Sequence, residues 1–244
     1  MKQFIVFIIC TFACVFNIHG ETMNLTWIVD GETYAQTTCE YGDDIVLPTT
    51  PTKYGYTFQG WDEFTFLEYI QSSGTQRINT QYIVAENDVL TIKARFLNST
   101  SDNSDHMLIY SAGTTGLWFE TYGNSFYARF GSTTSVNTTI GNRLNGIYEI
   151  KKGSIKYNGN SVLSPSYYSM PAGPLHIFCR SDNSGCSSAR IEYFKITDGN
   201  TGNLVRDYVP ARRNSDGAIG LYDNVTQTFL TNSRTGTFIA GPDL

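Results

Sequence analysis

The chain has 244 residues, a formal net charge of −5 and only 16% charged residues. This charge excludes the strongly basic surface of a typical nucleic-acid-binding protein. The length fits one long all-β sandwich with a small additional module, and a core of that size needs no disulfide lattice. Abundant Tyr, Phe, Gly, Ser, Thr and Asn suit the strands and turns of a secreted β protein, and also suit a sugar-binding face.

Residues 1–20 have the pattern of a secretory signal peptide. Lys2 precedes an apolar run over Phe4–Phe16, which is too short to span a bilayer comfortably, and Gly20 is a small residue before the expected cleavage point. No second apolar stretch of membrane length follows. We therefore expect a secreted or cell-surface protein with no transmembrane segment in the mature chain.

Three cysteines lie outside this leader. Cys179 and Cys186 enclose a short polar loop, so they can form a disulfide in an oxidising compartment. The spacing of this pair forms no recognised Cys/His metal motif, so a metal site is the weaker interpretation. Cys39 is expected to be a buried or half-buried thiol in a strand.

Residues 21–62 begin with a hairpin pattern. Strand-like runs at Asn24–Val29 and Glu32–Glu40 flank Asp30-Gly31, which favours a type I′ turn. Pro48 and Pro51 then bracket a stiff, non-helical connection.

The motifs Trp-Ile-Val-Asp-Gly at 27–31, Leu-Pro-x-x-Pro at 47–51 and Gly-Tyr-Thr-Phe-x-Gly-Trp at 55–61 resemble the Listeria–Bacteroides repeat, or internalin B-repeat. The resemblance implies a small β-grasp-like module of bacterial surface and secreted proteins. The usual closing strand does not follow, so residues 21–62 are expected to be a truncated unit serving as a spacer or adaptor. We expect its aromatic side chains to pack across the hairpin: Trp27, Tyr56, Phe58 and Trp61.

Residues 63–244 alternate short runs of strand-forming residues with turn-forming clusters, which predicts an all-β sandwich. Val89–Phe96 alternates cleanly, and further strands are predicted at Leu117–Thr121 and Ser125–Phe130. The alternation slips within Ala189–Thr197, which indicates a β-bulge. No long helical period occurs outside the leader.

Both ends of this region carry a second resemblance. LEYIQSSGTQRINTQY at Leu67–Tyr82 and VRDYVPARRNSDGAIGLYDNVTQTFLTN at Val205–Asn232 are similar to concanavalin A-like, LamG-type domains of bacterial and phage surface proteins. The resemblance implies a jelly roll of two antiparallel sheets over residues 63–244, with its first and last strands adjacent, and it implies no enzyme. The pair Arg212-Arg213 then belongs to a structural turn.

The sequence contains no catalytic signature. The E-x-D-x-x-E string of laminarinase-like sandwiches, which aligns acids on one strand face, is missing. Glu120 and Glu149 are single acids in strands and are expected to have surface or turn roles, and neither His106 nor His176 lies in a catalytic motif. We expect no enzyme. A cryptic glycoside hydrolase is the less favoured alternative and requires two carboxylates roughly 5–10 Å apart.

No cofactor is predicted. LamG-type domains often bind calcium at a rim through Asp and backbone oxygens, which makes calcium a candidate ion. None of the loop aspartates forms a DxDxDG run, so solvated turn residues are the competing interpretation and the metal ligands stay open: Asp102, Asp105, Asp182, Asp198 and Asp223.

Aromatic side chains beside polar groups are what sugar binding requires. Trp118 and Tyr122 are separated by an even number of residues, so they can share one sheet face. A core role for Trp118 is the alternative. The predicted ligand-binding residues are Trp118, Tyr122, Tyr127, Arg129, Tyr167 and Tyr168. We expect a non-catalytic module that binds a glycan or another surface macromolecule, or acts in adhesion; a purely structural domain of an extracellular assembly is the alternative.

Overall fold

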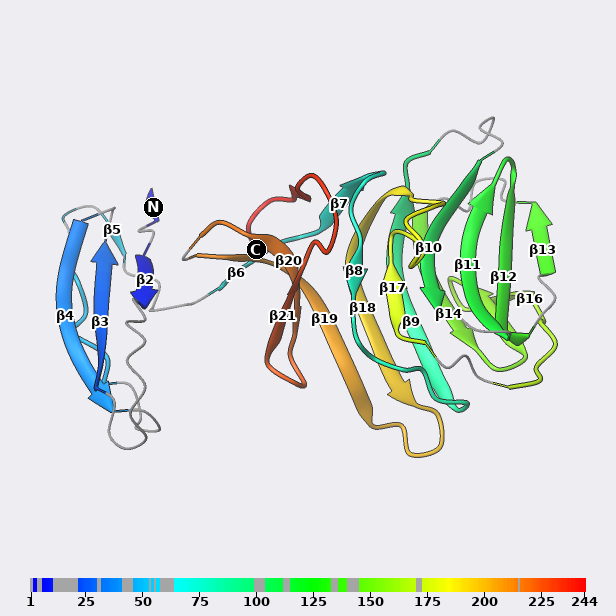
Figure 1. Cartoon of the computed structure of the whole chain (residues 1–244), viewed down its shortest axis with the longest axis horizontal. Coiled ribbons are helices and arrows are strands. Elements are labelled where there is room, and N and C mark those ends of the chain that lie inside the picture. The colour runs from blue at the N-terminus through cyan, green and yellow to red at the C-terminus, as the bar shows by residue number, and fades with distance from the viewer. Residues whose placement is uncertain are drawn as a thin grey trace. The chain divides into compact units, whose positions relative to one another are not determined.

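The structure is a computed structural model of the chain (Figure 1). It describes residues 2–3, 6–10, 22–29, 32–40, 46–52, 54, 56–57, 64–98, 104–111, 115–132, 136–139, 145–169, 173–214 and 216–244. Every regular element in these ranges is a strand, which confirms the predicted all-β class. The chain divides into two compact units, Met1–Thr65 with Arg213–Ala218, and Phe66–Arg212 with Ile219–Leu244.

The first unit contains two small sheets. Strands β2 (Val6–Cys10), β3 (Thr22–Val29) and β4 (Glu32–Glu40) form an antiparallel sheet in that order, and β1 (Lys2–Gln3) pairs in parallel with β5 (Tyr56–Thr57). The β3–β4 pairing confirms the predicted hairpin, although its turn lies outside the described residues.

A buried tryptophan stabilises this hairpin. Trp27 is fully buried, and its Nε1 donates a hydrogen bond to Thr37 Oγ1 over 2.8 Å. Cys39, in β4, is free and half-buried, as expected from the sequence. The predicted packing of Phe58 and Trp61 falls outside the described residues.

Strand β2 lies within the predicted leader. It pairs with β3 from Val6↔Val29 to Cys10↔Leu25, so in the full-length chain it occupies one edge of the hairpin. The expected cleavage point at residues 18–20 lies outside the described ranges. Cleavage there would leave β3 and β4 as a two-stranded sheet.

The second unit contains two sheets, and β6 (Phe64–Phe66) carries the chain into it. The smaller sheet has six strands in the order β13 (Val136–Thr139), β12 (Ser125–Ser132), β11 (Gly116–Tyr122), β10 (Asp105–Ser111), β17 (Leu175–Ile177) and β8 (Ile78–Asn79). The larger sheet follows the order β16 (Asn160–Leu163), β15 (Ser154–Tyr157), β14 (Asn145–Lys151), β9 (Asp88–Phe96), β18 (Ser188–Asp198), β19 (Leu204–Arg213), β20 (Ile219–Asp223) and β21 (Thr228–Thr231).

The core lies between the inner faces of these two sheets. Strand β9 alternates as predicted, with Leu90, Ile92, Ala94 and Phe96 buried. Aromatic rings from both sheets meet there, and the ring of Phe119 lies 4.9 Å from that of Tyr148. The arrangement is therefore sandwich-like, and hydrophobic burial between two sheets holds it together.

The two ends of the sandwich are adjacent in the larger sheet. Strand β22 (Ile239–Ala240) pairs with β7 (Ile70–Ser73), and β7 also pairs with the first part of β18. The predicted bulge is present in β18, where the register against β9 shifts between Ile191 and Tyr193. No helix long and apolar enough to cross a membrane occurs among the described residues.

Candidate functional site

The outer face of the six-stranded sheet carries four of the six predicted ligand-binding residues. In β11 and β12 every second side chain enters the core, including Phe119 and Phe126. The alternate positions therefore point away from the core. We call this set the aromatic face: Trp118, Glu120 and Tyr122 of β11 with Tyr127 and Arg129 of β12.

Trp118 and Arg129 form the tightest contact on the aromatic face. They lie directly opposite each other in register, and the guanidinium carbon of Arg129 is 3.6 Å from the indole centroid. A cation this close to an aromatic face is stabilised by the ring quadrupole. Gly116 makes room for this arrangement, because a Cβ atom there would lie 2.7 Å from Arg129 Nε.

A second arginine approaches the same indole from a loop. The guanidinium carbon of Arg180 is 4.6 Å from the Trp118 centroid. Its Nη2 also donates to Asp105 Oδ2 over 2.7 Å and to Glu120 Oε2 over 3.0 Å. Arg180 thereby links the indole ring to two carboxylates.

Glu120 is almost completely buried, with 4% of its surface exposed. Burial raises the pKa of its carboxyl, and the negative charge of Asp105 raises it further, whereas Arg180 acts in the opposite direction. The predicted surface or turn role for Glu120 is therefore wrong: this side chain is held inside an ion-pair cluster. Asp105, expected in a loop, begins β10 and remains partly accessible.

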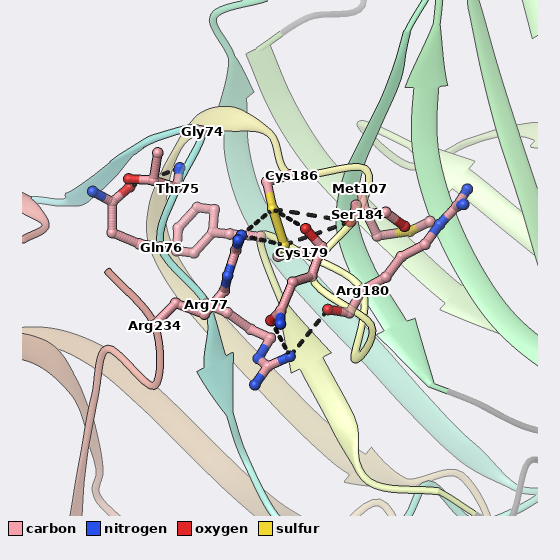
Figure 2. Close-up of a disulfide and its surroundings, with 12 residues drawn as sticks. Gly74, Thr75, Gln76, Arg77, Met107, Cys179, Arg180, Ser184, Cys186 and Arg234 are labelled. Atoms are coloured by element: carbon pink, nitrogen blue, oxygen red, sulfur yellow. Dashed lines mark hydrogen bonds between the residues drawn. A yellow bond between two sulfur atoms is a disulfide. The ribbon is translucent and has the colours of Figure 1, made fainter. Parts of the chain in front are cut away.

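The disulfide loop holds Arg180 in place. The structure has a disulfide between Cys179 and Cys186, which follows β17 directly in the chain. Figure 2 shows the guanidinium of Arg234 beside it, with Nη1 at 3.1 Å from the sulfur of Cys179 and 2.6 Å from that of Cys186.

Arg77 also donates hydrogen bonds to this loop. Its Nη1 donates to the backbone oxygen of Arg180 over 3.2 Å (Figure 2). The same nitrogen donates to Ser181 O over 2.6 Å and to Asn183 Oδ1 over 2.9 Å. Two arginines and one disulfide thus fix the backbone from which Arg180 reaches the aromatic face.

Tyr122 is the exposed residue of this face, and the half-buried Tyr127 lies beside it. Their rings meet edge to face, with centroids 6.1 Å apart and an interplanar angle of 89°. Tyr122 is 41% exposed, and Asp105 lies opposite it in the register of β10 and β11. An open aromatic ring next to a carboxylate is the combination that a sugar site requires.

The face continues onto β10 and β17 through Tyr110 and His176, which lie opposite each other in register. Their rings are 6.5 Å apart, and Tyr110 lies 6.0 Å from Trp118. His176 is 4% exposed, and its Nδ1 has no hydrogen-bond partner among the described residues. Burial lowers the pKa of His176 to about 4, and the charge of Arg77 contributes, so the imidazole is neutral at pH 7.

The two remaining predicted residues lie elsewhere. The ring of Tyr167 is 4.3 Å from Lys152 Nζ, which is not part of the aromatic face. The backbone of Tyr168 donates to Gly131 O near the end of β12 distant from Tyr127, and its side chain is 68% exposed. The structure gives neither tyrosine a contact with the other four predicted residues in the described part of the chain.

The candidate calcium ligands are not brought together. Asp105 pairs with Arg180, Asp223 pairs with Arg206, and Asp182 accepts hydrogen bonds from Ser184. Asp102 lies outside the described residues. Within the ranges that the structure describes, no three His, Cys, Asp or Glu side chains cluster as a metal site would require.

Sequence reasoning missed Arg180, Tyr110 and His176. Alternation in β11 could have placed Glu120 beside Trp118, since both occupy even positions. No local signal could have placed Arg180, because its position depends on a loop that folds across to another strand.

Comparison with known families agrees with the first resemblance. The model of the Listeria-Bacteroides repeat domain matches residues 24–91 and so runs past residue 62 into β9. Repeats of this type occur in bacterial surface proteins, which is consistent with a surface location and with a non-catalytic surface module. No curated protein matches the chain.

Proposed function

We propose that this protein is a secreted or cell-surface, non-catalytic module that binds a glycan on the aromatic face. Residues 1–20 are removed as a signal peptide, and residues 63–244 form a concanavalin A-like jelly roll. The observation that carries the proposal is the position of exposed Tyr122 on the outer side of one sheet, next to Tyr127 and to the partly accessible carboxylate of Asp105.

Tyr122 is the proposed stacking residue. Its exposed ring offers an apolar surface to the C–H face of a pyranose, and the Tyr127 ring supports it from the side. The partly exposed Asp105 carboxylate can accept hydrogen bonds from sugar hydroxyls. These groups match the general design of small-molecule sites, in which apolar contact is combined with a few oriented polar groups.

Trp118 has a supporting role in this proposal. Arg129 already covers one surface of the indole at 3.6 Å, so that surface is not open for stacking. The indole instead packs against both guanidinium groups and so holds two positive charges on this face. The sequence left Trp118 open between a binding residue and a core residue, and this supporting role is neither an open platform nor a core position.

Mutation of the aromatic face tests the proposal. Once a glycan ligand is identified, Tyr122→Ala should weaken binding at least tenfold without changing the far-ultraviolet circular dichroism spectrum. Tyr168→Ala is the matched control, because it removes an exposed tyrosine outside this face. Equal affinity for both variants and the unmodified protein would exclude Tyr122 from the site.

A glycoside hydrolase is the second candidate, and the geometry of Asp105 and Glu120 favours it. Both carboxylates lie within hydrogen-bond distance of the same Arg180 nitrogen, and Glu120 has the raised pKa of a general acid. However, Arg180 occupies the space between them, and Glu120 is nearly inaccessible to a substrate.

The hydrolase candidate predicts turnover that Glu120→Gln abolishes. The non-catalytic proposal predicts no hydrolysis of the bound glycan by the unmodified protein. Product analysis by mass spectrometry after prolonged incubation separates the two. A purely structural domain, the remaining alternative, predicts no glycan binding at all.

A further inference from the structure

A hollow lies on the larger sheet of the sandwich. It has a volume of about 550 Å³, and its lining comes entirely from the second unit. This volume is within the usual range for small-molecule sites. The residues that matter here are Tyr69, Arg95, Asn145, Arg190, Glu192 and Tyr193.

Two arginines face each other across neighbouring strands in this hollow. Arg95 of β9 and Arg190 of β18 are direct register partners, and Asn145 of β14 lies opposite Arg95 on its other side. Like charges placed directly opposite in a sheet are unfavourable. The pair therefore costs stability unless an anion lies between the two guanidinium groups.

No carboxylate of the described chain fulfils that role. Glu192 is the extra residue of the β18 bulge and forms its ion pair with Lys93. The structure shows no ion pair between either arginine and Glu68 or any other acid in the described ranges. The side chain of Arg95 makes neither a hydrogen bond nor an ion pair with any described residue.

Two contacts fix the orientation of the Arg190 guanidinium. Its Nε donates to Gln71 Oε1 over 2.7 Å, and its guanidinium carbon lies 4.3 Å from the Tyr69 ring. These contacts fix the plane of the guanidinium and leave its two terminal nitrogens for a ligand. A planar guanidinium with free terminal nitrogens is suited to bidentate binding of a carboxylate.

We propose that this hollow binds a sugar carboxylate, such as that of a uronic acid, between Arg95 and Arg190. Asn145 supplies an amide for a neighbouring hydroxyl, and Tyr193 supplies ring surface beside it. The site is separate from the aromatic face, because it lies on the larger sheet. It does not require the glycan site proposed above to exist.

Ligand-observed nuclear magnetic resonance with galacturonic acid tests this proposal on the whole protein. We expect binding of galacturonic acid and at least a tenfold weaker response from galactose and from the methyl ester of galacturonic acid. Arg95→Gln and Arg190→Gln should each reduce the affinity at least tenfold. Lys156→Gln is the matched control, because Lys156 is on the same sheet but outside the hollow and pairs with Glu149.

A second readout does not depend on the sugar. Arg95→Gln should raise the melting temperature at low salt, because it removes a charge that faces Arg190, and 0.5 M NaCl should shrink the difference. The proposal is overturned if galacturonic acid gives no response, if both arginine variants bind as the unmodified protein does, or if sulfate or an acidic peptide binds at this site with equal affinity. Tyr122→Ala, which changes only the aromatic face, should bind galacturonic acid as the unmodified protein does.

Discussion

The guanidinium carbon of Arg129 lies 3.6 Å from the centroid of the Trp118 ring, and the two residues are direct partners in adjacent strands. This pair organises the aromatic face. Arg180 also lies against this indole. Trp118 is the only tryptophan in residues 63–244, and its ring contacts both arginines on the face that carries Tyr122 and Tyr127.

The coupling between Trp118 and Arg129 can be measured directly. A double-mutant cycle of Trp118→Ala and Arg129→Ala should give about 0.5 to 2 kcal/mol of interaction energy, since the pair is partly desolvated. Urea unfolding supplies the four free energies. Additive losses would show that the contact contributes nothing.

Gly116 offers an independent test of the same contact. Gly116→Ala should displace the Arg129 guanidinium, because the new Cβ would lie 2.7 Å from its Nε. The Arg129 Nε–H proton should therefore lose its ring-current shift. Ser161→Ala is a suitable control, because it changes an exposed position of β16 on the other sheet. An unchanged Arg129 signal in Gly116→Ala would contradict the packing described.

His176 should make stability depend on pH. Its pKa falls from 6.5 to about 4 on folding, so between these values the unfolded chain binds more protons than the folded one. The associated stability is fully present above pH 6.5 and is lost as the pH falls towards 4, with a total of roughly 3 kcal/mol.

His176→Phe should remove that part of the pH dependence. Phenylalanine cannot titrate and suits a buried position beside the Tyr110 ring. Chemical unfolding at several pH values between 4 and 7 should show a flatter profile for the variant. Parallel profiles for the two proteins would mean that His176 is not buried in its neutral form.

The disulfide should hold Arg180 against the aromatic face. Replacing Cys179 and Cys186 together by Ser should lower the free energy of unfolding by about 2 to 3 kcal/mol, as expected for a short closed loop. Because the loop carries Arg180, the protons of its guanidinium should also lose the ring-current shift that the Trp118 ring imposes on them. A stable variant with an unchanged shift would show that Arg77 and Arg234 hold the loop without the disulfide.

Removal of the leader should weaken the first unit. Strand β2 pairs with β3 in the full-length chain, and an isolated two-stranded hairpin is marginally stable. In a chain that begins at Glu21, amides of β3 should exchange faster with solvent than in the full-length chain, while those of β9 should not change. Equal exchange of β3 in the two chains would contradict this pairing.

Local patterns were sufficient to predict much of the fold. The alternation in Val89–Phe96 gave the inward face of β9, and its slip in β18 gave the bulge. The even spacing of Trp118 and Tyr122 placed them on one face. The same alternation could have put Glu120 there, but Glu120 was expected to have a surface or turn role, and its burial beside Arg180 depends on the distant loop.

The parts that sequence could not predict depend on distant partners. Arg180 reaches the face because Arg77 and Arg234, far away in the chain, hold its loop. Arg95 and Arg190 lie opposite each other because of the register in which β9 and β18 pair. Glu192 lies in the bulge of β18 and pairs with Lys93, not with either arginine. Neither the position of the Arg180 loop nor the pairing of Arg95 with Arg190 can be predicted from a periodic pattern in the sequence.

The most direct test of the central claim is a glycan-array screen of the chain starting at Glu21, with and without calcium. The account predicts binding to a defined group of glycans, and loss of that binding in Tyr122→Ala with the fold intact. A blank array under both conditions would contradict glycan recognition and would favour a structural or protein-binding role.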